Sequence, residues 1–385
     1  MRRILFIFGT RPEAIKLCPV IRHLRERPAE FQVRVCVTAQ HRELLDQVLD
    51  VFQVRPDHDL DLMLPGQSLF QSTSRIIAGL EPVLAAESPD LVLVQGDTTT
   101  TFCGALAGFY QRIPVGHVEA GLRTGDIDHP FPEEINRLLA TRLCSLHFAA
   151  TRWAADNLLR EGVDASRIHI TGNSGIDAVL HVARALEEGR LAGSDWPQLD
   201  LSRKLIVVTA HRRESFGERF ESICRALARL AGRDDVQIVY PVHPNPNVEE
   251  PVNRLLRSEP NVLLLKPLPY VPFVDLLRRA YLLITDSGGI QEEGPSLGKP
   301  ILVMRDKTER PEAVEAGTVR LVGADEDRIV SEAARLLDDP DAYRRMSLVH
   351  NPYGDGRASA RIADAMLEFF GGASLRLAGG PPARG

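Results

Sequence analysis

Short apolar runs alternate along the chain with longer stretches of helical period. The apolar runs are rich in Val, Ile and Leu, which is typical of strands buried on both faces of a parallel sheet. In the first half we predict strands at Ile4–Phe8, Val33–Thr38, Leu91–Val94, Val115–Val118 and Ile168–Thr171. The stretches between them predict helices at Glu13–Arg25, Glu43–Phe52, Leu69–Ala86, Phe102–Tyr110 and Ala154–Glu161. In the second half we predict strands at Leu205–Thr209, Val236–Tyr240, Val262–Leu265, Leu282–Thr285, Ile301–Met304 and Arg320–Val322.

This alternation, which restarts halfway along the chain, predicts an α/β protein with two doubly wound parallel sheets. The segment 187–203, "EEGRLAGSDWPQLDLSR", is rich in Gly, Pro and Asp and has weak periodicity, so we predict a linker there. We therefore expect a first domain over residues 1–186 and a second domain over 204–357. Residues 371–385 end in "GGPPARG" and predict a disordered tail.

The composition excludes several classes of protein. A formal net charge of −6 gives no overall attraction to nucleic acid, so an anionic ligand would need a local cluster of cations. The five cysteines are scattered without a CxxC pair, which predicts reduced thiols in a cytoplasmic protein and no metal site. No stretch approaches the roughly 20 apolar residues of a membrane span. The first apolar run, Ile4–Phe8, is followed at once by Arg11 and Glu13, which indicates a strand rather than a signal peptide.

Two doubly wound sheets in one chain most simply face each other across a cleft, and such sheets bind ligands at the carboxyl ends of their strands. In "FGTRPEAIKLCPV", Arg11 and Lys16 bracket a predicted helix start, a place that favours anions. A capped helix with solvated charges would look the same. In "LVLVQGDTTTTF", Asp97 follows a buried strand, where a helix cap is the competing interpretation.

The segment "VGHVEAGLRTGDIDHPFPEEINR" carries more acids than a helix start needs. Glu119 lies at a strand end, and Glu133, Glu134 and Arg137 open a helix behind an irregular loop. One of the two adjacent glutamates is accounted for by stabilisation of the helix dipole. The remaining acids lie where loops over rigid strand ends usually carry chemistry.

The second half repeats this arrangement with basic residues. In "LIVVTAHRRESFG", His211 and Arg212 follow a buried strand, and the flanking cations favour a neutral imidazole unless an anion is bound. In "YPVHPNPNV", His243 and Asn245 are either ligand contacts or turn residues.

The segment "TDSGGIQEEGPSLGKP" has a glycine pair between a buried strand and a helix. Ser287, Gly288 and Gly289 would let backbone N–H groups approach a diphosphate, and Glu293 one turn on would accept ribose hydroxyls. Arg310, in the nearby "RDKTERPEA", is a natural phosphate partner. A tight strand–helix turn and unpaired surface charge are the alternatives.

Taken together, these segments resemble the non-hydrolysing UDP-N-acetylglucosamine 2-epimerases. The motifs "FGTRPEAIKLCPV", "TAQHRELLDQV", "QGDTTTTF", "HVEAGLRTGD", "PFPEEINR", "TAHRRESFG", "VHPNPNV", "TDSGGIQEE" and "TERPEAV" match in order, to about Phe370. The resemblance implies two Rossmann-like domains of the glycosyltransferase-B type, with the last helix, 358–370, returning to the N-terminal domain. It also implies a homodimer that needs no metal and no cofactor.

Matching motif by motif, the resemblance assigns the catalytic positions to Asp97, Glu119, Glu133 and His211. It implies substrate binding by Arg11, Lys16, Arg137, Arg212, His243, Asn245, Ser287, Gly288, Gly289, Glu293 and Arg310. Gln40, His41, Arg42 and Glu43 form a possible allosteric region for a second UDP-GlcNAc. There the sequence departs from the family, because Glu43 replaces an expected glutamine and Gly66 an expected arginine, which puts allosteric activation in doubt.

The implied reaction is reversible epimerisation of UDP-GlcNAc to UDP-ManNAc, which supplies surface polysaccharide synthesis. UDP would leave C1 to give 2-acetamidoglucal and then add back. Asp97 and Glu119 would transfer protons, and Glu133 would orient the sugar or share in the proton transfer. His211 with the arginines would stabilise UDP. The alternatives are a glycosyltransferase of the same architecture, an epimerase for a modified UDP-GlcNAc, and a non-catalytic nucleotide-sugar sensor.

Overall fold

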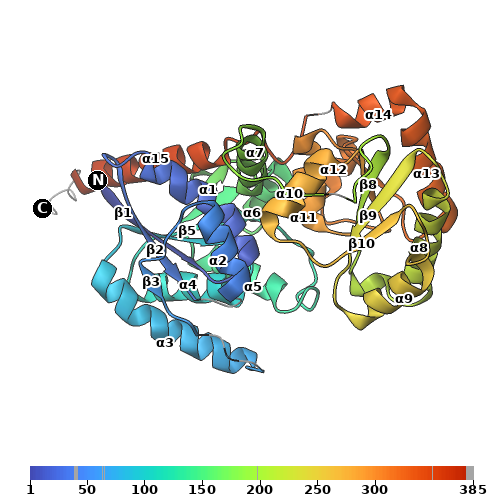
Figure 1. Ribbon diagram of the computed structural model, residues 1–385. Helices are drawn as coiled ribbons and strands as arrows, with labels where there is room; N and C mark the ends of the chain where they lie inside the picture. The colour runs from blue at the N-terminus through green and yellow to red at the C-terminus, as the bar shows by residue number, and fades with distance from the viewer. Residues whose placement is uncertain (39–41, 63, 65, 197, 349, 379–385) are drawn as a thin grey trace, which may run out of the picture. The chain divides into compact units, whose positions relative to one another are not determined.

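A computed structural model describes residues 1–38, 42–62, 64, 66–196, 198–348 and 350–378. The chain forms two compact units. The first unit comprises Met1–Ala178 together with the C-terminal segment from Gly354 onward, and the second comprises Val179–Tyr353. Figure 1 labels most of the helices and several strands of both units.

The first unit has one parallel sheet, with the strand order β3-β2-β1-β4-β5-β6-β7. Its strands are β1 (Arg2–Phe8), β2 (Phe31–Val37), β3 (His58–Asp59), β4 (Leu91–Gln95), β5 (Val115–Ala120), β6 (Leu146–Ala149) and β7 (Ile168–Ile170). Its helices are α1 (Arg11–Arg25), α2 (Arg42–Val51), α3 (Leu69–Glu87), α4 (Thr99–Tyr110), α5 (Glu133–Leu143), α6 (Arg152–Arg160), α7 (Ser174–Glu187, which continues into the second unit) and α15 (Ala358–Ala378).

Helices cover both faces of this sheet. Leu5 and Ile7 of β1 pack in one apolar cluster with residues of α3 and α4. Because side chains alternate across a strand, the equally buried Ile4 and Phe6 face the other side. Helix α1 contacts α2 and α15, which form a separate group. The central strands β1 and β4 are therefore buried on both faces, as their continuous apolar runs predict.

The second unit also has one parallel sheet, with the order β10-β9-β8-β11-β12-β13. Its strands are β8 (Lys204–Thr209), β9 (Val236–Pro241), β10 (Val262–Leu265), β11 (Leu282–Thr285), β12 (Ile301–Val303) and β13 (Val319–Leu321). Its helices are α8 (Glu218–Ala231), α9 (Pro246–Leu256), α10 (Tyr270–Arg279), α11 (Gly288–Glu293), α12 (Pro311–Glu315), α13 (Glu326–Asp338) and α14 (Pro340–Ser347).

Every strand predicted from the sequence is present, within two residues at either end. Two further strands, β3 and β6, were not predicted. Strand β3 has only two residues, and β6 is a four-residue segment, "LHFA", too short for its apolar pattern to be distinguished from a helix end.

The chain passes from the first unit to the second inside α7, between Ala178 and Val179. The segment expected to be a linker, 187–203, belongs to the second unit. It is anchored there because Trp196 donates its indole N–H to Asp275 Oδ2 at 2.9 Å. The domain limits expected from composition therefore differ from the division seen here.

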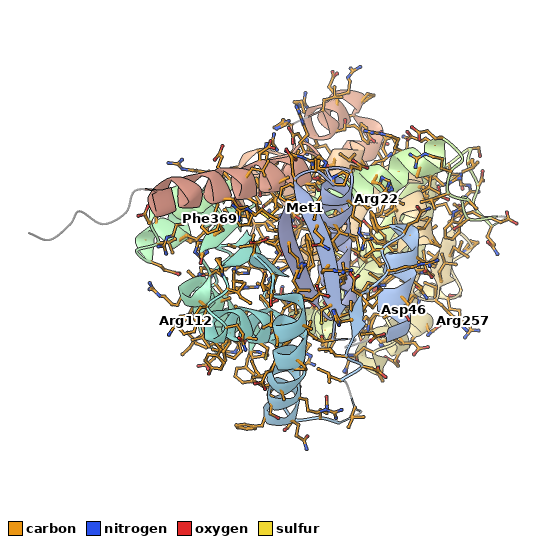
Figure 2. The ribbon with its side chains drawn as sticks, turned by 90° about the vertical axis from the view of Figure 1, so that its left-hand side faces the viewer. Met1, Arg22, Asp46, Arg112, Arg257 and Phe369 are labelled. Carbon is orange, nitrogen blue, oxygen red and sulfur yellow. The ribbon has the colours of Figure 1, made fainter. Side chains whose placement is uncertain are left out.

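Helix α15 returns to the first unit and lies beside α1 (Figures 1 and 2). Arg27 and Asp364 form an ion pair at 3.0 Å, and the Arg2 guanidinium lies 4.8 Å from the Phe370 ring centroid. The helix extends through Ala378, past the predicted end at residue 370, and the rest of the expected tail lies outside the described residues. Among the described residues, every helix is too short or too polar to span a bilayer.

Figure 2 shows charged side chains such as Arg22, Asp46 and Arg112 at the surface of the first unit. The five cysteines are all buried and none is in a disulfide. Most charged side chains thus lie at the surface, around apolar cores. A few charged side chains near strand ends are buried instead, and the regions around them are examined next.

Candidate functional site

Both sheets reverse their strand order at one point, between β1 and β4 in the first unit and between β8 and β11 in the second. In open parallel sheets such a switch point leaves a crevice at the carboxyl ends of the strands, where ligands bind. The residues that follow β1, β4, β8 and β11 are therefore the first candidates in each unit.

In the first unit, Glu13 ties these strand ends together. Its buried carboxylate accepts hydrogen bonds from the backbone N–H groups of Gly9 and Thr10, at 3.1 and 2.8 Å. It also accepts hydroxyl hydrogen bonds from Thr98 and Thr101 in the β4–α4 turn. Burial raises the pKa of Glu13, and these hydrogen bonds oppose that shift. Apart from the helix-capping pattern of Thr10 and Glu13, no feature of the sequence indicates this role.

Gly9 is required at this turn by close packing. A Cβ atom at this position would overlap the Thr38 hydroxyl and lie 2.9 Å from that of Thr100. The turn after β1 therefore packs tightly against its neighbours, which fixes the start of α1 and the positions of Arg11 and Lys16.

Glu119 is the best anchored of the predicted carboxylates. It is the penultimate residue of β5 and has a left-handed backbone conformation, φ 63°, which is uncommon for a residue with a side chain. Its Oε1 forms an ion pair with Lys16 and accepts a hydrogen bond from Asn173 at 3.4 Å, while Oε2 accepts from Gln95. Lys16, predicted to contact the nucleotide sugar, thus pairs with a carboxylate in this structure.

Asp97 is held by Arg137. The guanidinium donates to Asp97 Oδ2 from Nε at 3.0 Å and from Nη2 at 2.6 Å. Asp97 does not cap α4, because Thr98 is the cap and accepts from the Thr101 N–H at 3.2 Å. The capping interpretation of Asp97 is therefore wrong, and its carboxylate is available for another role.

The two adjacent glutamates of α5 have different environments. Glu134 is buried, accepts from the backbone N–H groups of Thr124 and Gly125 at 3.0 and 3.1 Å, and pairs with Arg137 at 2.8 Å. Glu133 is half-buried, and its carboxylate has no hydrogen bond or ion pair with another described residue. Glu134 is thus the structural member of the pair, and Glu133 has the free carboxylate.

Arg137 is charged in spite of its burial. Burial by itself would lower its pKa, but Asp97 and Glu134 outweigh that effect and raise the pKa. Arg11 is half-buried in the first turn of α1 and forms no ion pair within the described part of the chain. Of the two predicted arginines in this unit, Arg137 thus supports a carboxylate, and Arg11 remains available to an anionic ligand.

A buried histidine of β5, His117, which was not predicted from the sequence, supports the turn before Asp97. His117 Nε2 lies 2.7 Å from the carbonyl oxygen of Gly96, the residue before Asp97. A carbonyl only accepts, so this nitrogen carries the proton. Burial lowers the pKa of His117 to about 4, so the ring is neutral near pH 7. A Cβ on Gly96 would lie 3.8 Å from Glu119 Oε2, so His117 supports the turn that Glu119 faces.

In the second unit, Asp286 occupies the turn after β11 and was also not predicted. Its buried Oδ2 accepts from the backbone N–H groups of His211 and Arg212 at 2.6 and 2.7 Å. Its Oδ1 lies 3.4 Å from His211 Nδ1. Burial lowers the pKa of His211, an effect that Asp286 opposes and that His243 and Arg212 reinforce. The Arg212 Nε is buried and has no hydrogen-bond partner.

The two residues predicted after β9 differ in role. The His243 ring stacks on His211, with 5.4 Å between centroids and 14° between planes. Asn245 caps α9, because its side-chain oxygen accepts from the Asn247 N–H at 2.9 Å. Asn245 thus has the turn role that was the alternative interpretation, and His243 Nδ1 also takes part in the turn by accepting from the Asn245 N–H at 3.2 Å, while its ring belongs to the group around His211.

The glycine pair after β11 has two different environments. A Cβ at Gly288 would overlap the Arg310 guanidinium, which pairs with the buried Glu292. At Gly289 the nearest side-chain atoms would be 3.9 Å away or more. Gly288 thus makes room for Arg310, and Gly289 leaves open space over the start of α11. Ser287 precedes them as N-cap without a side-chain capping bond, and Glu293 is half-buried.

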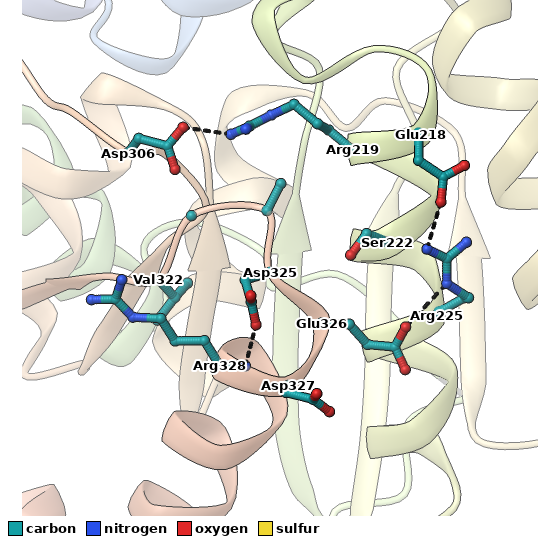
Figure 3. Close-up of a pocket in the computed structure, with 12 residues that line it drawn as sticks. Glu218, Arg219, Ser222, Arg225, Asp306, Val322, Asp325, Glu326, Asp327 and Arg328 are labelled. Carbon is teal, nitrogen blue, oxygen red and sulfur yellow. Dashed lines mark hydrogen bonds and ion pairs between the residues drawn. The ribbon is translucent and has the colours of Figure 1, made fainter.

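A hollow of about 640 Å³ also lies in the second unit (Figure 3). Two of its three arginines are paired with acids: Arg219 with Asp306 at 2.7 Å, and Arg225 with Glu326 at 3.0 Å. None of the residues predicted to bind substrate lines it. Because acids outnumber arginines in its lining, it is a poor phosphate site compared with the switch point.

The possible allosteric region is only partly described. Gln40 and His41 lie outside the described residues, and Arg42 and Glu43 open α2. Within the described residues, no cluster of three His, Cys, Asp or Glu side chains is arranged to hold a metal ion.

Comparison with known proteins gives one consistent family. A family model described as UDP-N-acetylglucosamine 2-epimerase matches residues 22–367. The UDP-N-acetylglucosamine 2-epimerase of Escherichia coli strain K12 is 58% identical over 369 residues, which cover 94% of this chain and 98% of that protein.

Solved structures give the same result. The UDP-GlcNAc 2-epimerase of Neisseria meningitidis bound to UDP-GlcNAc has a TM-score of 0.88 at 47% identity, and the match covers 95% of this chain and 100% of that one. The Methanocaldococcus jannaschii enzyme in complex with UDP-GlcNAc and UDP has a TM-score of 0.77 at 32% identity, covering 95% and 99%. The predicted fold class, two Rossmann-like domains of the glycosyltransferase-B type, is confirmed.

Proposed function

Because the chain belongs to the UDP-N-acetylglucosamine 2-epimerase family, we propose that it interconverts UDP-N-acetylglucosamine and UDP-N-acetylmannosamine by inverting C2 of the sugar. It is an isomerase of this type, and its substrates are nucleotide sugars. The predicted carboxylates lie in the first unit, whereas His211, Arg212 and Arg310 lie in the second. This distribution supports action of the first unit on the sugar and binding of the nucleotide by the second.

The chemistry requires C1 to react before C2. The C2–H of an acetamido sugar has no neighbouring carbonyl and is weakly acidic, so direct deprotonation is too slow. In the forward direction the C1–O bond breaks and its electron pair leaves on UDP. A carboxylate takes the C2 proton, and the C2–H electron pair becomes the C1=C2 bond of 2-acetamidoglucal. In the second half, the UDP oxygen adds to C1 while an acid delivers a proton to the opposite face of C2.

The observation that carries this proposal is the pair of carboxylates at neighbouring strand ends of the first sheet. Asp97 follows β4 and is held by Arg137, and Glu119 is the penultimate residue of β5 and is held by Lys16. Proton transfer on opposite faces of a ring needs two such groups, each held in one orientation. We assign both to proton transfer and assign Glu133, whose carboxylate is unpaired among the described residues, to the sugar.

The second unit supplies groups for the departing diphosphate. His211 and Arg212 lie after β8, the unpaired Arg212 Nε is a ready donor, and Arg310 lies next to Gly288. Donors directed at the oxygen where charge develops contribute strongly to catalysis. We assign Ser287, Gly288, Gly289, Glu293 and Arg310 to the nucleotide, as the family motifs imply.

The test is an NMR time course with UDP-GlcNAc and no acceptor, run in heavy water. We expect the C2 epimer to form with deuterium at C2, and an ¹⁸O label in the bridging position to scramble into the other β-phosphate oxygens. Product without deuterium excludes proton transfer at C2, and epimerisation without scrambling excludes C–O cleavage. A glycosyltransferase would leave the donor sugar unchanged.

Two further expectations stay proposals. We propose that the enzyme is a homodimer, which sedimentation equilibrium tests directly. We also propose that its product supplies N-acetylmannosamine units to a surface polysaccharide, so that loss of the gene would deplete this sugar in hydrolysed cell-surface material.

A further inference from the structure

Asp286 forms a buried bridge between β11 and β8. Its own N–H donates to the Thr209 carbonyl at 3.1 Å, and its Oδ2 accepts from the N–H groups of His211 and Arg212. Below it, the hydroxyls of Thr209 and Thr285 are 2.6 Å apart. Two backbone N–H groups therefore hold Oδ2, and the backbone of Asp286 is itself tied to β8, so the carboxylate is held beside His211.

The second oxygen of this carboxylate has no hydrogen-bond donor among the residues that the structure describes. Asp286 Oδ1 is buried and unpaired, and it faces His211 Nδ1 at 3.4 Å. That distance is longer than a good N–H···O hydrogen bond of about 2.9 Å. Buried carboxylate oxygens without donors are rare in proteins, because leaving them unpaired costs stability. Catalytic hydrogen bonds are often long before substrate binds and shorten in the complex.

Three charged or titratable groups surround the His211 imidazole. Asp286 faces its Nδ1, the His243 ring is stacked on its face, and Arg212 follows it in the chain. The ring is 40% exposed, and its Nε2 has no partner among the described residues. One nitrogen thus faces a fixed carboxylate, while the other is open to a ligand.

We propose that Asp286 is a positioning residue that holds His211 with Nδ1–H directed at Oδ1 and stabilises the imidazolium, whose Nε2–H donates to the UDP oxygen that leaves C1. This role in catalysis rests on the proposed function. The proton on Nε2 stabilises the electron pair that the broken C1–O bond leaves on UDP, and it remains available when UDP adds back. Asp286 itself touches neither substrate nor product.

The decisive variant is Asp286→Asn. The side-chain oxygen of asparagine can still accept from the two backbone N–H groups, but its NH₂ group then faces His211 Nδ1. An NH₂ group only donates, so Nδ1 must accept and the neutral ring must carry its proton on Nε2. Loss of the negative charge also disfavours the imidazolium, so the pKa of His211 falls. Asp286→Asn therefore moves the proton of the neutral His211 ring from Nδ1 to Nε2, with little effect on the turn after β8.

The first measurement is ¹⁵N NMR of histidine-labelled protein, with His211 assigned from the spectrum of His211→Gln. In the wild-type protein we expect the neutral ring to be protonated at Nδ1. In Asp286→Asn we expect protonation at Nε2 and a lower pKa. Asp275→Asn is the matched control, because Asp275 is equally buried in the same unit and binds Trp196 and two arginines. It should leave the His211 resonances unchanged.

The second measurement is the pH dependence of kcat. If protonated His211 assists departure of UDP, kcat falls as the pH rises through the His211 pKa in the complex. In Asp286→Asn this fall should move to lower pH, and kcat near pH 7 should drop by about 10²-fold. The control Asp275→Asn should keep the wild-type pH profile even if its Tm is lower.

The outcomes separate the two proposals. A wild-type His211 that is protonated at Nε2 when neutral overturns the positioning role without any variant. An unchanged tautomer in Asp286→Asn, or an unchanged pH profile, also overturns it. If the wild-type protein does not epimerise UDP-GlcNAc, the proposed function fails, whereas the NMR result still decides the Asp286–His211 relation.

Discussion

The switch points of the two sheets share a topology but have opposite charge arrangements. In the first unit the Asp97 side chain is 29% exposed and its partner Arg137 is 10% exposed, so the acid faces outward and the cation supports it. In the second unit His211 is 40% exposed and Asp286 is 1% exposed, so the acid is the support. The same strand-and-turn framework can thus present either carboxylates or cationic groups, depending on which member of a pair is buried.

The strongest test of this comparison removes the buried member in the first unit. Arg137→Met leaves Glu134 buried without its cation and Asp97 without its support. We expect the free energy of unfolding to fall by about 3–5 kcal/mol, as for other broken buried pairs, and kcat to fall as well. Urea titration and the NMR assay measure the two effects. Arg123→Met, which breaks the partly buried pair with Glu161, is the control and should lower stability with kcat unchanged.

The next test neutralises an acid without changing its shape. Glu119→Gln keeps the hydrogen-bond acceptor for Asn173 but removes the charge next to Lys16. We expect kcat to fall by about 10²–10³-fold, because a positioned proton-transfer group is lost. Deuterium incorporation at C2 should fall in parallel. Glu161→Gln serves as control, and equal kcat values for the two variants would contradict the assignment.

Two buried histidines of the first unit extend the comparison to pH. Burial lowers the pKa of His117 to about 4 and that of His147 to about 3. A lowered pKa in the folded state gives stability that is full above pH 6.5 and is lost as the pH falls below it. We expect about 3 kcal/mol from His117 over this window. In His117→Gln, the free energy of unfolding should decline less steeply between pH 6.5 and 4 than in the wild type; equal slopes would count against this account.

The smallest expected effect is a difference in UDP binding between alanine variants of Gly288 and Gly289, the two glycines after β11. Gly288→Ala should displace Arg310 from Glu292 and weaken UDP binding about tenfold, since a charge-assisted contact is lost. Gly289→Ala meets no protein atom closer than 3.9 Å, so the fold should be unaffected. Calorimetric titration with UDP measures both, and the Tm of each variant shows whether the fold is retained. A loss of UDP binding in Gly289→Ala alone would indicate that the diphosphate lies over that residue.

Local sequence pattern was sufficient for the framework and for the segments that carry the chemistry. Buried parallel strands have continuous apolar runs, so β1, β4, β8 and β11 and the polar residues after them were predicted. The pattern was not sufficient where a role depends on a partner distant in the sequence. That the Asp97 carboxylate is held by Arg137, and that Glu134 rather than Glu133 is structural, depends on Arg137, Thr124 and Gly125.

The supporting residues were missed for the same physical reason. Asp286 resembles an ordinary turn residue after β11, and only its hydrogen bonds to His211 and Arg212, which follow a different strand, show its role. His117 resembles one more residue of a buried strand until its bond to the Gly96 carbonyl is seen. Glycine spacing likewise did not reveal that Gly288 makes room for Arg310.

Helix α15 has a consequence for biosynthesis. Ile362 and Met366 are fully buried in the first unit, and Asp177 caps the start of the helix by accepting from the N–H groups of Ala358 and Ser359, at 3.2 and 2.8 Å. During translation, all of residues 179–353 emerge from the ribosome before this helix does. The second unit can therefore complete its fold before α15 is available, whereas the first unit must wait for a helix made after the whole of the second unit.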